Sequence, residues 1–174
     1  IFYIDELLSW FLYGANPKDY FRYNFYKLNH RGKKEFFTMR NSNKMVKKFN
    51  NKEQIYMFVN KADFNLRFSE FIGRKWIYAP KTLDDDIISF IKSSKVVFIK
   101  PNSLSSGKGI YKVSFDSINN LNEFCIKVKR DNCLIEEVII QHEKMKSLNP
   151  SSVNTIRGYT FIDGFGKPHI IATT

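Results

Sequence analysis

A lysine followed by a glycine-containing loop is the feature of this sequence best suited to chemistry. An apolar run ends in Lys100 and Pro101, and a polar segment containing Gly107 and Gly109 separates it from a second apolar stretch at residues 110–113. This order predicts a strand, a flexible loop and a strand. A lysine fixed at a strand end lies beside N–H groups that glycines allow to approach an anion closely. The segment is therefore suited to hold a polyphosphate, and a plain hairpin with Ser/Gly turn chemistry is the alternative.

The order of these residues excludes two common phosphate-binding loops. In a P-loop the lysine is followed by Ser or Thr, whereas Lys108 is followed by Gly109. In a protein kinase the glycines come first and the lysine lies on a later strand. Here Lys100 precedes the glycines.

Two further segments contain charged residues at positions that indicate a function: the start of a predicted helix and the end of a predicted strand. A helix beginning near Lys61 directs its unpaired N–H groups and positive dipole end outward, which predicts a second anion site. Glu136 and Glu137 end an apolar strand at residues 133–138. Two acids in that position are unfavourable unless they are solvated, paired or functional.

The last part of the chain predicts a hairpin. Residues 153–161 alternate in polarity, a turn follows at residues 163–166, and a second strand runs over residues 168–174. Asn154 and Arg157 occupy positions of opposite parity, so they point to opposite faces of such a strand. A surface ion pair is the alternative role for Arg157.

The order of these features resembles that of the ATP-grasp superfamily, and more narrowly of the sugar-transfer-associated ATP-grasp family found with capsule and cell-surface polysaccharide genes. The similarity extends from residue 19 to the final hairpin. Its specific pieces are FIKP at 98–101, GKG at 107–109, EE at 136–137 and NTIR at 154–157.

The resemblance implies that ATP binds between two α+β lobes, with Lys61 and Lys100 at its phosphates. Glu136, with the backbone around Glu137 and Val138, would hold adenine, whose amino group needs an acceptor and whose ring nitrogen needs a donor. The residues expected to fold over the phosphates are Ser105, Ser106, Gly107, Lys108 and Gly109.

The resemblance also implies a reaction. In the superfamily a substrate carboxylate attacks the γ-phosphate to form an acylphosphate, which an amine or thiol then displaces. Arg157 is the candidate for contacting the acylphosphate or the substrate anion, with Asn154 as the second catalytic candidate. The family's Mg²⁺ ligands lie on strands after this hairpin, so we expect the 174-residue piece to be a fragment that turns over ATP negligibly.

These patterns predict an α+β, ATP-grasp-like fold with three parts. An N-terminal helical region covers residues 1–60, a nucleotide-binding lobe with an antiparallel sheet covers residues 61–138, and residues 139–174 begin the second lobe. Within the first part we expect helices at residues 5–13, 19–28 and 33–49. In the second, Thr82 is expected to cap a helix whose first turn carries three acids at residues 84–86.

Charge indicates an anionic partner without naming it. Lys and Arg number 28 against 17 Asp and Glu, a net charge of +11. A nucleic-acid-binding module using Tyr20, Tyr23 and Tyr26 for base stacking is one alternative, although core packing is the more common use of such aromatics. An ATP-grasp scaffold that binds nucleotide without chemistry is another.

Cysteine usage and hydropathy indicate a cytoplasmic location. Two cysteines and three scattered histidines give neither a disulfide framework nor metal-ligand spacing, which favours a reducing compartment. The apolar opening at residues 1–13 is too short to span a bilayer, so we expect a packed helix and no transmembrane segment.

Overall fold

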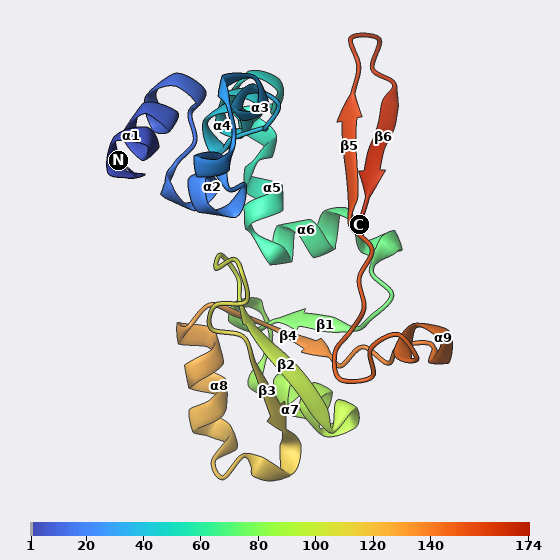
Figure 1. The fold of residues 1–174 in the computed structure, drawn as a ribbon. Coiled ribbons are helices and arrows are strands. Elements are labelled where there is room, and N and C mark those ends of the chain that lie inside the picture. The colour runs from blue at the N-terminus through green and yellow to red at the C-terminus, as the bar shows by residue number, and fades with distance from the viewer. Residues whose placement is uncertain (1) are drawn as a thin grey trace. The chain divides into compact units, whose positions relative to one another are not determined.

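The computed structural model describes residues 2–174 and divides into two compact units, Ile1–Asp63 and Phe64–Thr174 (Figure 1). Each unit has a buried core of its own. The units are described separately below.

The first unit is helical. Its elements are α1 (Phe2–Tyr13), α2 (Pro17–Arg22), the 3-10 turn η1 (Phe25–Lys27), α3 (His30–Lys34), α4 (Met39–Phe49), the 3-10 turn η2 (Lys52–Gln54) and α5 (Tyr56–Val59). Helix α6 (Lys61–Arg67) crosses the boundary between the units. The single helices expected over residues 19–28 and 33–49 are each interrupted, the first at Asn24, whose φ of 51° is left-handed.

Aromatic side chains form the core of this unit. Tyr20 and Phe25 are fully buried with Ala15, and Tyr23 stacks on Phe36 with ring centroids 4.9 Å apart. Tyr20 is therefore occupied in core packing, as the more common interpretation of this aromatic stretch predicted.

Helix α1 turns its apolar side outward, whereas the sequence predicted a helix with that side packed inward. Its one buried residue is the polar Ser9, whereas the apolar residues at helical spacing that were expected to pack inward are exposed: Leu7, Leu8, Phe11 and Leu12. The inward side is held by Lys33, whose Nζ lies 2.5 Å from Oδ1 of Asp5 and 3.1 Å from Oγ of Ser9. Tyr20 donates its hydroxyl to the other carboxylate oxygen of Asp5 at 2.8 Å. A partly buried polar cluster, together with the packing of Tyr13 on the aromatic core, thus attaches α1 to the unit.

The end of α1 is fixed by a glycine and an arginine. Gly14 has a φ of +72°, and its N–H donates to the carbonyl oxygen of Trp10. A Cβ at Gly14 would lie 2.6 Å from Cβ of Arg40. Arg40 in turn donates to the carbonyl oxygens of Trp10 and Phe11 in the last turn of the helix.

The second unit contains a four-stranded antiparallel sheet in the order β1-β4-β2-β3. The strands are β1 (Trp76–Tyr78), β2 (Val96–Pro101), β3 (Tyr111–Ser114) and β4 (Cys133–Glu137). The 3-10 turn η3 (Ser69–Phe71) precedes β1, and the connections between the strands hold α7 (Asp84–Ser94), α8 (Leu121–Arg130) and the 3-10 turns η4 (Ala79–Lys81) and η5 (Phe115–Ser117). The strand, loop and strand predicted around Lys100 are confirmed as β2 and β3, and the mixed α+β class is confirmed with them.

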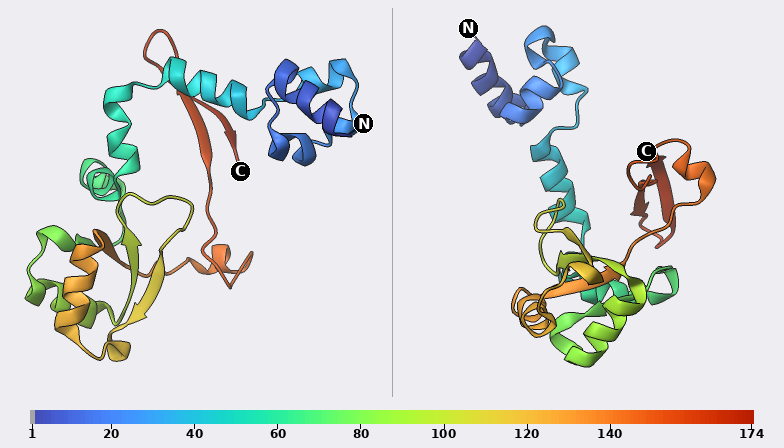
Figure 2. Two further views of the ribbon diagram at one scale, coloured as in Figure 1. Left: turned by 90° about the vertical axis from the view of Figure 1, so that its left-hand side faces the viewer. Right: turned by 90° about the horizontal axis from the view of Figure 1, so that it is seen from below.

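Alternation along the strands separates the two faces of the sheet. Val97, Ile99 and Ile135 point to one face, where they form a single core with buried residues of α7 and α8. Figure 2 shows both helices on this same side of the strands. The opposite face carries Lys100 and Glu136, which lie at the alternate positions of β2 and β4.

Helix α7 begins at Asp84, and Thr82 does not cap it as predicted. The N-cap is Leu83, and the hydroxyl of Thr82 donates to the carbonyl oxygen of Tyr78 at 2.8 Å. The three acids of the first turn lie where the sequence predicted them, and Asp84 pairs with Lys129 of α8.

After β4 the chain forms α9 (Glu143–Lys146) and a two-stranded hairpin of β5 (Gly158–Ile162) and β6 (Pro168–Thr173). The hairpin is confirmed, although β5 starts at Gly158 and not at residue 153. The Asp163 carboxylate accepts from the N–H groups of Phe165 and Lys167 and therefore orders the turn. Among residues 2–174, no helix has both the length and the hydropathy to cross a membrane.

Candidate functional site

Three charged side chains meet on the face of the sheet opposite α7 and α8. Oε2 of Glu136 accepts from Nε of Arg74 at 2.7 Å and from Nζ of Lys100 at 2.5 Å. Only 2% of Glu136 is exposed, while its two partners reach solvent. We call Arg74, Lys100 and Glu136 the charged trio.

Strand register brings the charged trio together. Glu136 lies between Phe98 of β2 and Trp76 of β1, because β4 is paired on both sides. Lys100 is two residues beyond Phe98 and therefore points to the same face. Arg74 precedes Trp76 by two residues and approaches from the other side.

The two cations control the ionisation of Glu136. Burial raises the pKa of this carboxyl, but hydrogen bonds from Arg74 and Lys100 outweigh burial and hold the pKa below its usual value. Glu136 is therefore ionised at neutral pH. Two cations around one carboxylate leave excess positive charge, which suits an anionic ligand.

Glu137 is bound to the segment that precedes β1. Its carboxylate accepts from the N–H of Lys75 at 2.9 Å, and its own N–H donates to the carbonyl oxygen of Lys75 at 3.0 Å. The N–H of Glu137 is thus engaged within the protein. Val138, the next residue, follows the end of β4 and is half-buried.

The loop predicted to cover phosphates joins β2 to β3. All of its predicted ligand residues are exposed: Ser105, Ser106, Gly107, Lys108 and Gly109. Three residues of the loop have left-handed backbone: the φ angle is 57° at Ser106, 74° at Gly107 and 70° at Gly109. Backbone of this kind can form anion-binding concavities, although the N–H groups of Lys108 and Ile110 donate to carbonyl oxygens within the loop.

Gly109 fixes the loop to the strand that carries Lys100. A Cβ at this position would lie 2.9 Å from Cγ of Pro101, which is closer than real Cβ contacts allow. The loop therefore folds back onto the residue that follows Lys100. Lys100 and the loop that was predicted to bind phosphate therefore lie at the same end of β2.

Lys61 is the first residue of α6 and belongs to the first unit. The side-chain oxygen of Asn60 accepts from the N–H groups of Ala62 and Asp63 at 3.1 and 3.3 Å. The helix start that was predicted to bind an anion is therefore capped by the protein itself.

Asn154 and Arg157 lie in the segment between β4 and β6. Nδ2 of Asn154 donates to Oε1 of Gln141 and to the carbonyl oxygens of Met145 and Asn149. Arg157 exchanges two backbone hydrogen bonds with Thr174 at the end of the hairpin, and it is exposed. These contacts give Asn154 a role in ordering its loop, and catalysis by either residue stays a prediction.

The sequence analysis missed Arg74. Two signals indicate it in retrospect: a buried glutamate needs more than one partner, and Arg74 shares the parity of the strand residues Trp76 and Tyr78. Its partner Glu136 is 62 residues away, so the pairing of β1 with β4 must be known before the contact can be inferred.

The described residues hold no group of three His, Cys, Asp or Glu side chains able to bind a metal ion. Both cysteines are free and buried, and burial raises the pKa of the Cys125 and Cys133 thiols. Neither thiol is thus poised as a nucleophile.

Comparison with known proteins gave no significant match to a protein-family model, a curated protein or a solved structure.

Proposed function

We propose that the second unit is an ATP-grasp-like nucleotide-binding domain, with ATP held on the sheet face that carries the charged trio. One observation carries the proposal: Arg74 and Lys100 converge on the single carboxylate of Glu136, at the end of the sheet where the glycine-containing loop begins. Cations beside a glycine-containing loop are suited to bind a polyphosphate.

The neighbours of Glu136 suit a planar base. Trp76 and Phe98 are its direct partners in the two flanking strands, and both are half-buried. These aromatic side chains supply an apolar surface for a ring. This arrangement supports adenine near Glu136 and phosphates toward the loop.

The reaction follows from the resemblance and is part of the proposal. ATP would activate a carboxylate for condensation with an amine or thiol, in the synthesis or modification of cell-surface polysaccharide. Lys100 and Arg74 would neutralise phosphate charge, and the N–H groups of the loop would orient it. We assign no Mg²⁺ ligands to the described residues.

Calorimetric titration with ATP tests the binding site. Lys100→Met keeps the side-chain bulk and removes the charge, so the dissociation constant should rise at least about tenfold. Lys92→Met, on the exposed side of α7, removes the same charge elsewhere and should leave the constant unchanged. Because Lys100 also pairs with Glu136, circular dichroism must first show that each variant is folded.

An unchanged dissociation constant in Lys100→Met would overturn the assignment.

A salt titration separates this proposal from a basic nucleic-acid module. In a nucleic-acid module, the affinity for an oligonucleotide would fall steeply with salt and would not change on adding ATP. At a nucleotide site, ATP should displace a bound nucleotide.

A further inference from the structure

Helix α1 presents to solvent the side that other helices bury. Tyr13 packs against the core of the unit, but the other eight large apolar or aromatic residues of α1 each have between 51% and 82% of their surface exposed: Phe2, Tyr3, Ile4, Leu7, Leu8, Trp10, Phe11 and Leu12. Asp5 and Ser9 occupy the inward side through their contacts with Lys33. A helix that is apolar over most of its surface needs an apolar environment outside its own unit.

The surface of α1 indicates what that environment is. Its twelve described residues rise about 18 Å along the helix axis and are apolar over most of the exposed surface, which suits a helix lying in the interface of a bilayer. Trp10 and Tyr3 are residue types that favour the level of the lipid headgroups.

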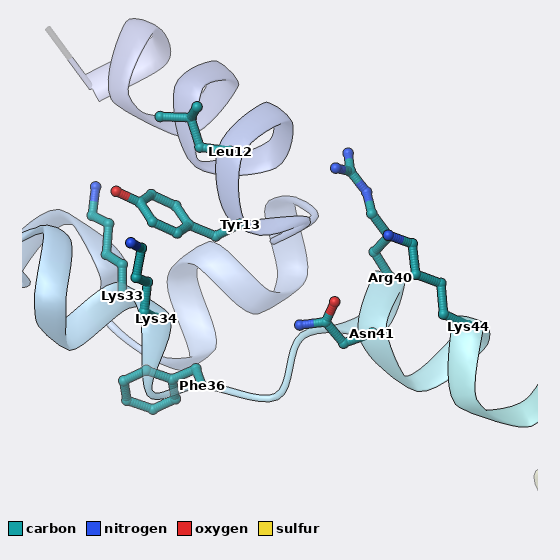
Figure 3. Close-up of a pocket in the computed structure, with 8 residues that line it drawn as sticks. All are labelled: Leu12, Tyr13, Lys33, Lys34, Phe36, Arg40, Asn41 and Lys44. Atoms are coloured by element: carbon teal, nitrogen blue, oxygen red, sulfur yellow. The ribbon is translucent and has the colours of Figure 1, made fainter.

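A basic pocket of about 200 Å³ adjoins the last turn of α1 (Figure 3). Its lining consists of Leu12, Tyr13, Lys33, Lys34, Phe36, Arg40, Asn41 and Lys44. Four of these eight described residues are basic and none is acidic, although Asp5 neutralises the charge of Lys33. The pocket therefore favours an anion next to an apolar helix.

Positive charge extends from the pocket along α4. Arg40, Lys44, Lys47 and Lys48 recur at helical spacing on one side of this helix. In the first unit as a whole, residues 1–63, twelve Lys and Arg face six Asp and Glu. A second copy of so basic a unit would be repelled, whereas an anionic surface would be attracted.

We propose that the first unit docks on an anionic membrane surface, with α1 lying in the interface and the phosphate of a lipid headgroup in the basic pocket. An anionic bilayer offers the two required environments side by side: an apolar layer for α1 and negative charge for the pocket and α4. The proposal concerns residues of the first unit only and is independent of ATP binding by the second.

Co-sedimentation of the full chain with vesicles tests the charge requirement. Binding should be at least about tenfold stronger to phosphatidylcholine vesicles containing a quarter phosphatidylglycerol than to pure phosphatidylcholine. The double variant Lys34→Glu with Lys44→Glu should lose at least about tenfold in partitioning to the anionic vesicles. The matched control, Lys18→Glu with Lys52→Glu, changes the same charge at exposed sites outside the pocket and should lose clearly less.

Tryptophan fluorescence tests the position of α1. In a Trp76→Phe background Trp10 is the remaining tryptophan, and its emission should shift to shorter wavelength on adding anionic vesicles. Ile4→Ser with Phe11→Ser should abolish both the shift and the co-sedimentation. Circular dichroism checks that each variant keeps its helices.

Three results would overturn the proposal. Equal loss of binding in the pocket variant and its control would show general attraction without a headgroup site. Binding of inorganic pyrophosphate by the pocket, with no binding to vesicles, would assign it to a soluble anion. Conversion of a dimer to a monomer by Ile4→Ser with Phe11→Ser, with vesicle binding absent or unchanged, would make α1 a protein interface.

Discussion

Lys100 and Glu136 meet diagonally across two neighbouring antiparallel strands, with Nζ of the lysine 2.5 Å from Oε2 of the glutamate. The glutamate is almost fully buried, so the lysine that we assign to ATP phosphate also neutralises a core carboxylate. Binding and folding therefore depend on the same ammonium group. Arg74 also neutralises this carboxylate, by donating to the same oxygen.

Glu136→Gln should destabilise the second unit by about 3 kcal/mol at neutral pH, because it leaves two cations without their buried partner. The pKa of Glu136 is lowered on folding, so its contribution is complete above its usual pKa of 4.5 and is lost as pH falls through the lower folded value. Urea unfolding between pH 3 and pH 6 should show a flatter acid decline in the variant than in the wild type. Glu123→Gln, an exposed acid of α8, is the control and should keep the wild-type slope.

Substitution of the two loop glycines should have unequal effects. Gly107→Ala introduces a left-handed alanine in open space and should cost about 1 kcal/mol. Gly109→Ala adds a collision with Pro101 and should cost roughly twice as much. Thermal unfolding measures both, and equal losses would show that the contact with Pro101 does not constrain the loop.

Hydrogen exchange across residues 103–109 should be fast in the free protein. The side chains of the loop are exposed throughout, and its turn contacts are long, such as that from the N–H of Lys108 to the carbonyl oxygen of Ser105 at 3.2 Å. Adding a non-hydrolysable ATP analogue should slow the exchange. Strong protection without nucleotide would favour a plain, rigid hairpin.

Asn154→Ala should loosen residues 141–154 without changing ATP affinity. The amide group of Asn154 donates to three acceptors in this loop, and the backbone N–H of the same residue donates to Gln141. Exchange in the loop should become faster by about tenfold, and the ATP dissociation constant should stay within about twofold. Asn119→Ala, on the exposed surface before α8, serves as the control, and a large change in ATP affinity for Asn154→Ala would favour a direct role instead.

The first unit should lose stability in strong alkali. Burial, together with the hydrogen bond to Asp5, raises the pKa of Tyr20 to about 12. Its neutral form is therefore favoured by folding, and that contribution is intact below pH 10 and is lost as pH rises from 10 toward 12. Helical circular dichroism followed over this range should fall less steeply in Tyr20→Phe, which has already lost the contact. A steeper fall in the variant would contradict the assignment.

Local patterns were enough to predict much of the second unit. Apolar runs punctuated by glycine gave β2, the loop and β3, and the position of Glu136 on an otherwise apolar strand indicated that it needed partners. The acids of the first turn of α7 were likewise read from sequence alone. Each of these features depends on residues close together in the chain.

Features that depend on distant partners could not be predicted in the same way. Arg74 joined the charged trio only because β1 pairs with β4, which no local pattern reveals. Helix α1 shows that apolar periodicity predicts a helix but does not determine which of its sides faces the core. The spacing of Leu8 and Phe11 predicts a helix, but the assumption that the apolar side faces inward fails where Lys33 supplies a buried partner for Asp5.

The sheet order β1-β4-β2-β3 also determines when the charged trio can form during synthesis. Strand β1 lies at the edge of the sheet and pairs there with β4, so Arg74 has no carboxylate partner until Glu136, 62 residues later, has left the ribosome. Strands β2 and β3, joined by one hairpin, can pair well before that moment. The nascent chain therefore carries Lys100 on a formed hairpin while its buried counter-ion is still missing, and arrival of β4 closes the longest loop of the sheet last.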